Sequence, residues 1–408
     1  MTSILVQAAP QRRATGITVV GIPARNEAAT VASVAVAADA GLQQAFPAGG
    51  NVIVLAENGS TDDTVDRFMA AGVRSRRFAV RSDGIGTGKG TNIFAIIDKA
   101  LELDADRVVL LDADVRSATA DWVGLLADAV DTALPAMAVP VYQRNRYEAN
   151  TTNQLASPLL AALFGTHVEQ PIGGEFAVNR AFMEASVEWR RSDSAYLYGI
   201  DVWLTGNALR NGHRVAQVPL GRKLHNSPFP KILSLPLQVL DSLLHVAVQV
   251  GRPCAVSTEP VPQRTAVDGT AVRQDPAIIA SVTRSVRGYL DKNMGAVREL
   301  FPTARALPAA PWGLRVATEE WPSLLAEGLA AVAAGCFEPA RDHLIGLYVN
   351  RVLSFWDEIE GLDEAGVNAL LDRQAADTVA QVAARSIDFT GAGLLPAGFH
   401  RGHWADIC

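Results

Sequence analysis

The chain has 408 residues, of which 49% are hydrophobic and 19% charged, and its formal net charge at pH 7 is -7. A single hydrophobic core rarely grows beyond ~250 to 300 residues, so this length predicts two domains. The acidic balance, without a long lysine or arginine run, argues against a nucleic-acid-binding protein, which needs a basic face, but a locally basic cleft for a small anion stays possible.

The cysteines and the N-terminal residues favour a cytoplasmic protein. Cys254, Cys336 and Cys408 lie far apart in the chain and form no CxxC pair, which favours reduced thiols. Residues 1–11 contain only a short apolar run, so we expect no signal peptide. No uncharged stretch reaches the ~18 residues of a membrane-spanning helix, so we expect no membrane insertion.

Strands alternate with helices in the first part of the chain. Apolar, β-branched runs predict strands, and the segments between them have helical character. The expected strands are residues 16–23, 51–56, 75–81 and 108–112. Such alternation predicts an α/β fold with a mostly parallel sheet.

The later part of the chain first continues the mixture of helices and strands, then passes through a Pro-, Thr- and Gly-rich segment into a helical region. Helices are expected at residues 121–134, 155–164 and 201–211, with strands at 137–142, 170–178 and 215–219. Residues 252–276 are rich in Pro, Thr and Gly, and the pattern beyond them is helical. We therefore predict an N-terminal extension (1–15), a catalytic domain (16–252), a linker (253–276) and a helical C-terminal domain (277–408).

Two carboxylates close the apolar strand of residues 108–112. Side chains alternate along a strand, so Asp112 and Asp114 are expected to point the same way at its carboxyl end, the edge where open α/β sheets bind ligands. A hard divalent cation, Mg²⁺ or Mn²⁺, suits such oxygen ligands. The alternative is a solvated acidic turn.

A glycine-rich turn at residues 84–90 contains Lys89 and precedes a helix. Backbone N–H groups and one ammonium in this arrangement favour contact with a phosphate. The spacing matches neither the GxxxxGK[ST] loop nor a GxGxxG fingerprint after the first strand, which argues against a dehydrogenase. A plain flexible loop is the alternative.

Together with these features, five further motifs resemble the sugar-nucleotide-dependent glycosyltransferases of the GT-A fold. The resemblance is closest to the mannosylglycerate synthase and glucosyl-3-phosphoglycerate synthase branch. The motifs are PARNE (23–27), NGSTDDT (58–64), QPIGGE (170–175), YGID (198–201) and His225. The QPIGGE and YGID pair followed by the histidine is the most specific part.

This resemblance implies roles for individual residues. It places the nucleoside against Pro23, Ala24, Glu27 and Asn58, and the nucleotide sugar against Lys89, Asp112 and Ala113. It makes Asp114 and His225 metal ligands, with Asp112 beside them, and makes Gly173 and Gly174 the floor of the donor-sugar site. Glu175 and Asp201 would contact the donor sugar or the acceptor, and Arg144 would pair with an acceptor carboxylate, with Arg146 as the alternative.

The resemblance also implies a metal-dependent, retaining hexosyltransferase that uses a UDP- or GDP-linked sugar. We see no dedicated nucleophile in the sequence, so we expect the leaving diphosphate to help take the acceptor proton. Residues 150–152 and 226–227 lack the arginine with which phosphoglycerate-using relatives grip their acceptor. We therefore expect a small, non-phosphorylated acceptor such as glycerate or a specialised metabolite.

Two other classes of function stay open at this point. A nucleotidyltransferase also combines a lysine-containing glycine-rich loop with an acidic metal site, and a non-catalytic sugar-nucleotide binder would keep the same pocket. The helical C-terminal region is expected to be structural. Its apolar stripe at residues 347–356 could form a homodimer interface or pack within the chain.

Overall fold

The computed structural model describes residues 16–82, 88–225, 231–254, 274–393, Leu395 and Trp404. The chain forms two compact units: Met1–Tyr142 with Gln170–Asn226, which we call the sheet unit, and Gln143–Glu169 with Ser227–Cys408, the helical unit. The predicted catalytic domain (16–252) differs from this division in two places, because residues 143–169 and residues 227–252 both belong to the helical unit. Most of the predicted linker lies outside the described residues.

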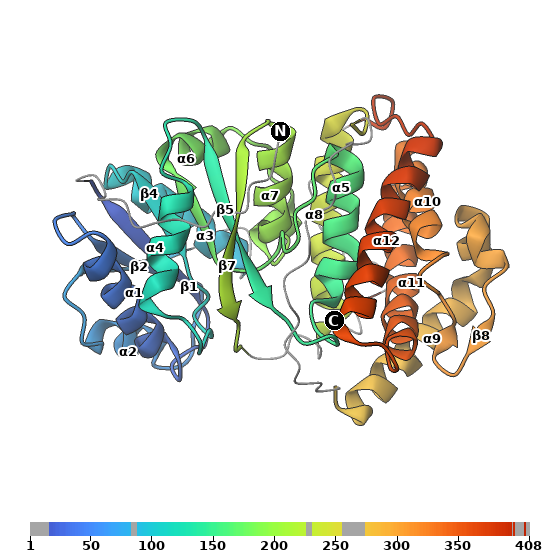
Figure 1. Cartoon of the computed structure of the whole chain (residues 1–408), viewed down its shortest axis with the longest axis horizontal. Helices are drawn as coiled ribbons and strands as arrows, with labels where there is room; N and C mark the ends of the chain where they lie inside the picture. The colour runs from blue at the N-terminus through green and yellow to red at the C-terminus, as the bar shows by residue number, and fades with distance from the viewer. Residues whose placement is uncertain are drawn as a thin grey trace. The chain divides into compact units, whose positions relative to one another are not determined.

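The sheet unit contains seven strands in the order β3-β2-β1-β4-β6-β5-β7 (Figure 1). The strands β1, β2, β3 and β4 pair in parallel, and β6 runs antiparallel to both β4 and β5. Their bounds are β1 Thr18–Ala24, β2 Val52–Glu57, β3 Arg76–Arg81, β4 Arg107–Leu110, β5 Ala136–Gln143, β6 Phe176–Asn179 and β7 Arg214–Arg222. The predicted α/β class with a mostly parallel sheet is confirmed.

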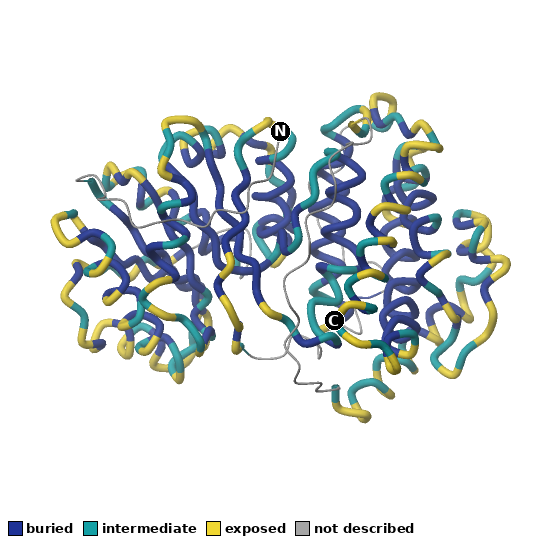
Figure 2. Tube along the Cα trace, viewed as in Figure 1, coloured by how far each residue is buried: buried dark blue, intermediate teal, exposed yellow. Residues whose placement is uncertain are grey.

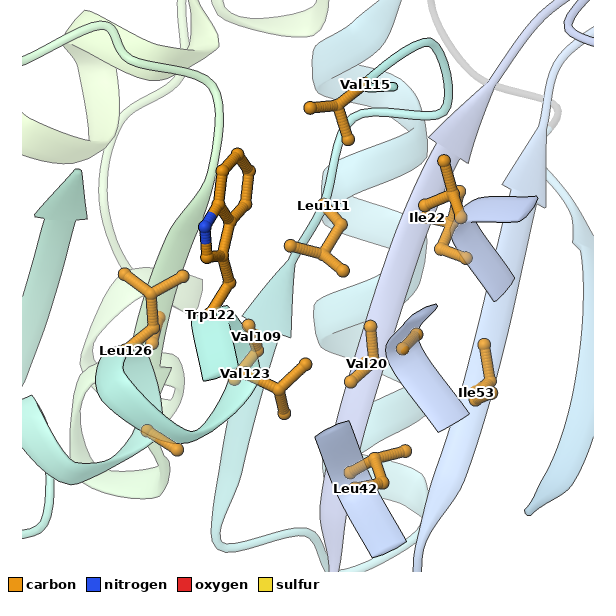
Figure 3. Close-up of a cluster of buried hydrophobic side chains, with 14 of the residues drawn as sticks. Val20, Ile22, Leu42, Ile53, Val109, Leu111, Val115, Trp122, Val123 and Leu126 are labelled. Atoms are coloured by element: carbon orange, nitrogen blue, oxygen red, sulfur yellow. The ribbon is translucent and has the colours of Figure 1, made fainter. Parts of the chain in front are cut away.

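Helices cover both faces of this sheet. They are α1 Val31–Ala45, α2 Thr64–Ala70, α3 Lys89–Glu102, α4 Ala120–Ala129, α6 Arg180–Val187 and α7 Ile200–Arg210. Val20 and Ile22 pack in one cluster with Leu42 of α1 and Trp122 of α4 (Figure 3). The residue between them, Gly21, faces Ile96 of α3 instead. Burial on both faces explains why the central strands are continuously apolar.

Strand register brings several functional motifs to one edge of the sheet. β1 pairs in parallel with both β2 and β4, so the carboxyl ends of all three lie together. β6 is antiparallel to β4 and pairs Phe176 with Leu110. The residue that precedes β6, Glu175, therefore lies at the edge where β4 ends.

The helical unit is built around α11 Phe337–Glu358, which is buried on nearly all sides. The other elements are η1 Thr152–Ala156, α5 Ser157–Phe164, α8 Ser234–Val250, α9 Pro276–Leu300, α10 Trp321–Ala333, α12 Glu364–Ala384 and the short strands β8 Ala309–Ala310 and β9 Gly313–Leu314. Figure 2 shows the inner helices of this unit as buried and the loops as exposed. The apolar stripe at residues 347–356 is buried within the unit, which favours the core-packing alternative over a dimer interface.

Among the helices that the structure describes, none is both long and apolar enough to cross a bilayer. The helix α8 contains Asp241 and His245, which are buried in the helical unit.

Candidate functional site

Two predicted nucleoside loops hold each other in place after β1 and β2. Asn26 adopts a left-handed φ of 57°, which asparagine tolerates better than most residues. Its side-chain oxygen accepts from the Thr61 N–H at 2.8 Å, and the Glu27 N–H donates to the Thr64 hydroxyl at 2.8 Å. These bonds fix the loop that follows Pro23 and Ala24, the two buried residues that end β1.

Lys89 links two of the predicted site carboxylates. It is the first residue of α3, and its Nζ lies 2.8 Å from Asp112 Oδ1 and 3.2 Å from both carboxylate oxygens of Asp201. Asp201 lies in the first turn of α7. The resemblance predicted roles for all three residues, and the fold brings them into one contact group.

Lys223, which the sequence analysis did not single out, continues this chain of charges. Its Nζ donates to Asp112 Oδ2 at 2.9 Å, to Glu175 Oε2 at 2.8 Å and to the Gly173 carbonyl at 2.9 Å. Glu175 Oε2 also accepts from the Tyr142 hydroxyl at 2.6 Å. The only sequence signal for Lys223 is its position two residues before His225.

Three carboxylates and two ammonium groups thus alternate in the order Asp201, Lys89, Asp112, Lys223, Glu175, which we call the charge chain. The members have opposite pKa shifts because they have different numbers of positive neighbours. Burial alone would raise the pKa of Asp112, but Lys223 and Lys89 together lower it well below its usual range. Burial raises the pKa of Glu175 and Asp201, each of which contacts a single ammonium.

The predicted floor of the donor-sugar site has a steric reason to be two glycines. A Cβ on Gly173 would lie 2.3 Å from the Pro140 ring, and a Cβ on Gly174 would lie 2.3 Å from Asp112 Oδ2 and 2.8 Å from Lys223 Nζ. Gly174 also has a φ of +100°, which disfavours any side chain. The absence of a Cβ thus lets Gly174 lie against Lys223 and Asp112, and lets Gly173 lie against Pro140.

Three buried acceptor atoms in this region have no hydrogen-bond partner within the described residues: Asn58 Oδ1, Glu175 Oε1 and Asp201 Oδ1. Asp201 Oδ1 has its ion pair with Lys89, which leaves Asn58 Oδ1 and Glu175 Oε1. The Asn58 side-chain amide donates to the Gly88 carbonyl at 2.8 Å, which ties the end of β2 to the residue before α3. Buried polar atoms are costly without a partner, so both oxygens fit ligand groups that donate hydrogen bonds.

The strand geometry expected for the two aspartates is wrong in one respect. β4 ends at Leu110, and the Val115 N–H reaches back to the Asp112 carbonyl at 3.4 Å, so the chain turns at Asp114. Strand alternation therefore does not set the direction of Asp114. The buried Ala113 separates the two carboxylates.

The loop after Asp114 is bonded to the segment that carries His225. The Arg116 N–H donates to the Leu224 carbonyl at 2.8 Å, and the Leu224 N–H donates to the Ser117 hydroxyl at 2.8 Å. Within the described part of the chain, no three His, Cys, Asp or Glu side chains are grouped closely enough to hold a metal ion. Both Asp112 oxygens contact lysines, so its metal role stays a prediction.

Acidic groups surround the predicted metal residue. Burial first, and then the charge of Asp114, raises the pKa of Glu27, with smaller contributions from Asp62 and Asp112. The pKa of the Tyr198 hydroxyl is also raised, mainly by burial. Lys89 lowers this pKa, whereas the negative charges of Asp112, Asp114 and Glu27 raise it. This concentration of negative charge suits a divalent cation.

The predicted acceptor residues belong to the helical unit. Arg144 lies there, and Arg146 donates to the Leu362 carbonyl at 2.6 Å. Asn150 accepts from the Trp356 indole N–H at 3.2 Å, and Thr151 lies 3.2 Å from the Tyr348 hydroxyl. Residues 226–227 and most of the glycine-rich turn, residues 83–87, lie outside the described residues.

Comparison with known proteins identifies similar chains. No protein-family model matches the chain. It is 28% identical over 247 residues to glucosyl-3-phosphoglycerate synthase of Mycobacterium tuberculosis H37Rv, covering 55% of this chain and 71% of the relative. It is 30% identical over 213 residues to the enzyme of that name from Mycolicibacterium paratuberculosis, covering 47% and 62%.

Solved structures of the Mycobacterium tuberculosis synthase are also similar. A complex with Mn²⁺, UDP and phosphoglyceric acid is 25% identical, with a TM-score of 0.46, over 57% of this chain and 78% of the other. A complex with Mg²⁺ and UDP is 24% identical, with a TM-score of 0.48, over 60% and 86%.

These relatives are named for a phosphorylated product, whereas we expected a non-phosphorylated acceptor for this chain. The chain is thus a relative of the glucosyl-3-phosphoglycerate synthases, which are glycosyltransferases of the GT-A fold, as its motifs predicted.

Proposed function

We propose that this protein is a metal-dependent, retaining glycosyltransferase that moves a hexose from a nucleoside diphosphate sugar to a small acid. The observation that carries this proposal is the buried charge chain, whose last member, Glu175, keeps one carboxylate oxygen without a partner among the described residues. Oxygen acceptors held in a fixed, buried geometry suit the hydroxyl groups of a sugar.

Asn58 supports a nucleoside whose base donates a hydrogen bond. One N–H of its side-chain amide donates to the Gly88 carbonyl, and Oδ1 has no partner among the described residues. The ring N–H of uracil or guanine could donate to this oxygen, and so could the exocyclic amino group of adenine or cytosine. The UDP- and GDP-linked donors therefore rest on the resemblance, and a comparison of donors tests them.

Lys89 would stabilise the departing diphosphate. Breaking the anomeric C–O bond leaves negative charge on that group, and a preorganised ammonium at the start of a helix is placed to offset it. Asp112 and Asp201 hold the Lys89 ammonium from two sides. No protein nucleophile is assigned, so the diphosphate oxygen that leaves would accept the proton of the acceptor hydroxyl on the same face.

A divalent metal would be held by Asp114 and the imidazole of His225, together with diphosphate oxygens. The residues fit such an ion because Mg²⁺ usually takes one or two carboxylates and completes its shell with phosphate and water. Burial is the main cause of the raised pKa of Glu27, and the charge of Asp114 adds to it, which is negative charge that a cation would offset. When bound, the metal would supply charge neutralisation for the diphosphate.

The acceptor is proposed only as a small carboxylate that Arg144 would pair with. The relatives are named for glucosyl-3-phosphoglycerate, and one was solved in complex with phosphoglyceric acid, so a phosphorylated acceptor must be compared directly with glycerate. The two acceptors differ by one phosphate, and competition between them measures what that phosphate contributes.

The test is a matrix of donors and acceptors. The protein is incubated with UDP-glucose, GDP-glucose or GDP-mannose, with 3-phosphoglycerate, glycerate or no acceptor, and with Mn²⁺, Mg²⁺ or EDTA. We expect a metal-dependent product with the mass of the acceptor plus one anhydrohexose, and an α-anomer by NMR from an α-linked donor. Pyrophosphate release from a nucleoside triphosphate and a sugar phosphate would instead indicate a nucleotidyltransferase.

Lys89→Met tests the role of the ammonium. Loss of an electrostatic group at the leaving diphosphate should lower kcat by roughly 10² to 10³-fold. The matched control is Lys99→Met, which removes a lysine that pairs with the exposed Glu102 on the same helix. Equal activity of the two variants would contradict the assignment.

A further inference from the structure

We propose that Lys223 is a positioning residue that decides which oxygen of Glu175 is offered to the donor sugar and thereby selects among hexoses; this rests on the proposed function. Its side chain is only 4% exposed. An ammonium has three N–H donors, and three acceptors lie 2.8 to 2.9 Å from Nζ. All three N–H groups of Lys223 thus donate to protein atoms, so Lys223 can affect a ligand only through these partners.

Among these partners, Glu175 is the one proposed to contact the donor sugar, and its side chain is fully buried. Its Oε2 accepts both from Lys223 and from the Tyr142 hydroxyl, which fills the two lone pairs of that oxygen. Its Oε1 is buried and has no partner among the described residues. Lys223 and Tyr142 therefore leave one oxygen, held in one direction, to accept a hydrogen bond from a sugar hydroxyl.

The backbone around Lys223 is shaped for this contact. The Gly173 carbonyl is its third acceptor, and a Cβ on Gly174 would lie within 2.8 Å of its ammonium. The pairing of Phe176 with Leu110 brings Glu175 to the edge from which Asp112 extends. The two glycines and the strand register thus both allow Lys223 to contact Asp112, Glu175 and the Gly173 carbonyl at the same time.

Removal of Lys223 should alter sugar recognition more than nucleotide binding. Asp112 would keep Lys89 as a partner, and Asn58 lies outside the contacts of Lys223. Glu175 would keep only Tyr142, so its carboxylate could rotate and offer either oxygen. When the direction of the Glu175 oxygen is not fixed, the carboxylate can rotate to accept a hydrogen bond from the hydroxyl group of either epimer. Neither sugar then leaves a buried oxygen unpaired, so the site loses its preference between epimers.

The experiment compares Lys223→Met with wild type and with Lys99→Met as the matched control. The ratio of kcat/KM for UDP-glucose and its C4 epimer UDP-galactose is measured, and the Kd of UDP is measured in Mn²⁺. We expect the ratio to move at least about tenfold toward one in Lys223→Met, with the Kd of UDP within about threefold of wild type. A loss of general structure would lower both kcat/KM values together and leave the ratio unchanged.

A wild-type ratio in an active Lys223→Met variant would overturn the inference. If that variant does not fold, Glu175→Gln is compared with the double variant Lys223→Met/Glu175→Gln, which removes the buried carboxylate charge together with the ammonium. Equal ratios in these two support action through Glu175, and a further tenfold change in the double variant overturns it. Wild-type protein that binds neither UDP nor any nucleotide sugar overturns the proposed function as well, which distinguishes the two failures.

Discussion

Asp112 and Asp114 are separated by one residue but have different surroundings. Each oxygen of Asp112 contacts a lysine ammonium, which makes Asp112 the centre of the charge chain. Asp114 lies in the turn, and its charge adds to burial, the larger cause, in raising the pKa of Glu27. Within this short motif, Asp112 therefore pairs with lysines of the protein, whereas Asp114 is the carboxylate proposed to bind a cation.

Asp114→Asn tests this division at the scale of one residue. Loss of a direct carboxylate ligand should weaken Mn²⁺ binding in the presence of UDP by about 100-fold or more, since even outer partners of metal ligands contribute ~10 to 100-fold. Mn²⁺ binding is measured by electron paramagnetic resonance, and the fold by circular dichroism. Asp66→Asn, on the exposed side of α2, is the control, and unchanged Mn²⁺ affinity in Asp114→Asn would exclude the metal role.

At the scale of elements, the Asp39 carboxylate of α1 bonds the residues that lead into the edge strand β3, and Gln43 of the same helix also donates to the Ser75 hydroxyl at 3.2 Å. Asp39 accepts from the Arg74 N–H at 2.9 Å and from the Ser75 N–H at 2.8 Å, just before β3 begins. Burial alone would raise the pKa of Asp39, but these bonds and that of the Ser75 hydroxyl outweigh it and lower the pKa. The ionised form is therefore the one that stabilises the fold.

Asp39→Asn should reduce the free energy of unfolding by ~1 to 3 kcal/mol at pH 7, because a buried N–H group loses its charged acceptor. A group with a lowered pKa stabilises the fold above its ordinary value, and this contribution is lost as pH falls through the folded-state pKa. The difference between wild type and variant should thus shrink below pH 3.8. Urea unfolding at pH 7 and pH 3 measures it, and a pH-independent difference would refute the electrostatic cause.

At the scale of the whole molecule, each unit has its own buried polar network. In the helical unit, Arg351 is fully buried and donates to Gln154, Gln374 and Glu358, as well as to Thr318 and the Val316 carbonyl. These bonds connect α11 to η1, to α12 and to the chain before α10. They explain why residues 143–169 fold with helices that follow them by more than 150 positions.

Arg351→Met should lower the free energy of unfolding by ~3 to 5 kcal/mol, because it leaves buried acceptors without their charged donor. Arg315→Met removes a pair with Asp357 whose side chains are 44% and 45% exposed, and should cost about 1 kcal/mol or less. Thermal unfolding measures both. The Kd of UDP for the folded Arg351→Met protein should match wild type, since the proposed nucleotide residues belong to the sheet unit, and a matched loss of both properties would argue against separate networks.

The sequence by itself determined the α/β class, the helical C-terminal part and most members of the candidate site. Apolar runs and their spacing are local properties, and the motifs carrying Lys89, Asp112, Glu175 and Asp201 are short enough to be recognised without a fold. The sequence also ranked the GT-A resemblance above the dehydrogenase reading, since no GxGxxG follows the first strand.

Only the tertiary structure decided what these residues contact. Lys223 reaches Asp112 and Glu175 across 111 and 48 positions, and no local pattern encodes an ion pair of that separation. The unit to which residues 143–169 belong was likewise decided by long-range bonds to Arg351, and the turn at Asp114 by a backbone bond that strand periodicity does not reveal. Periodicity records which face of an element is buried, whereas the partner on that face depends on packing of the whole chain.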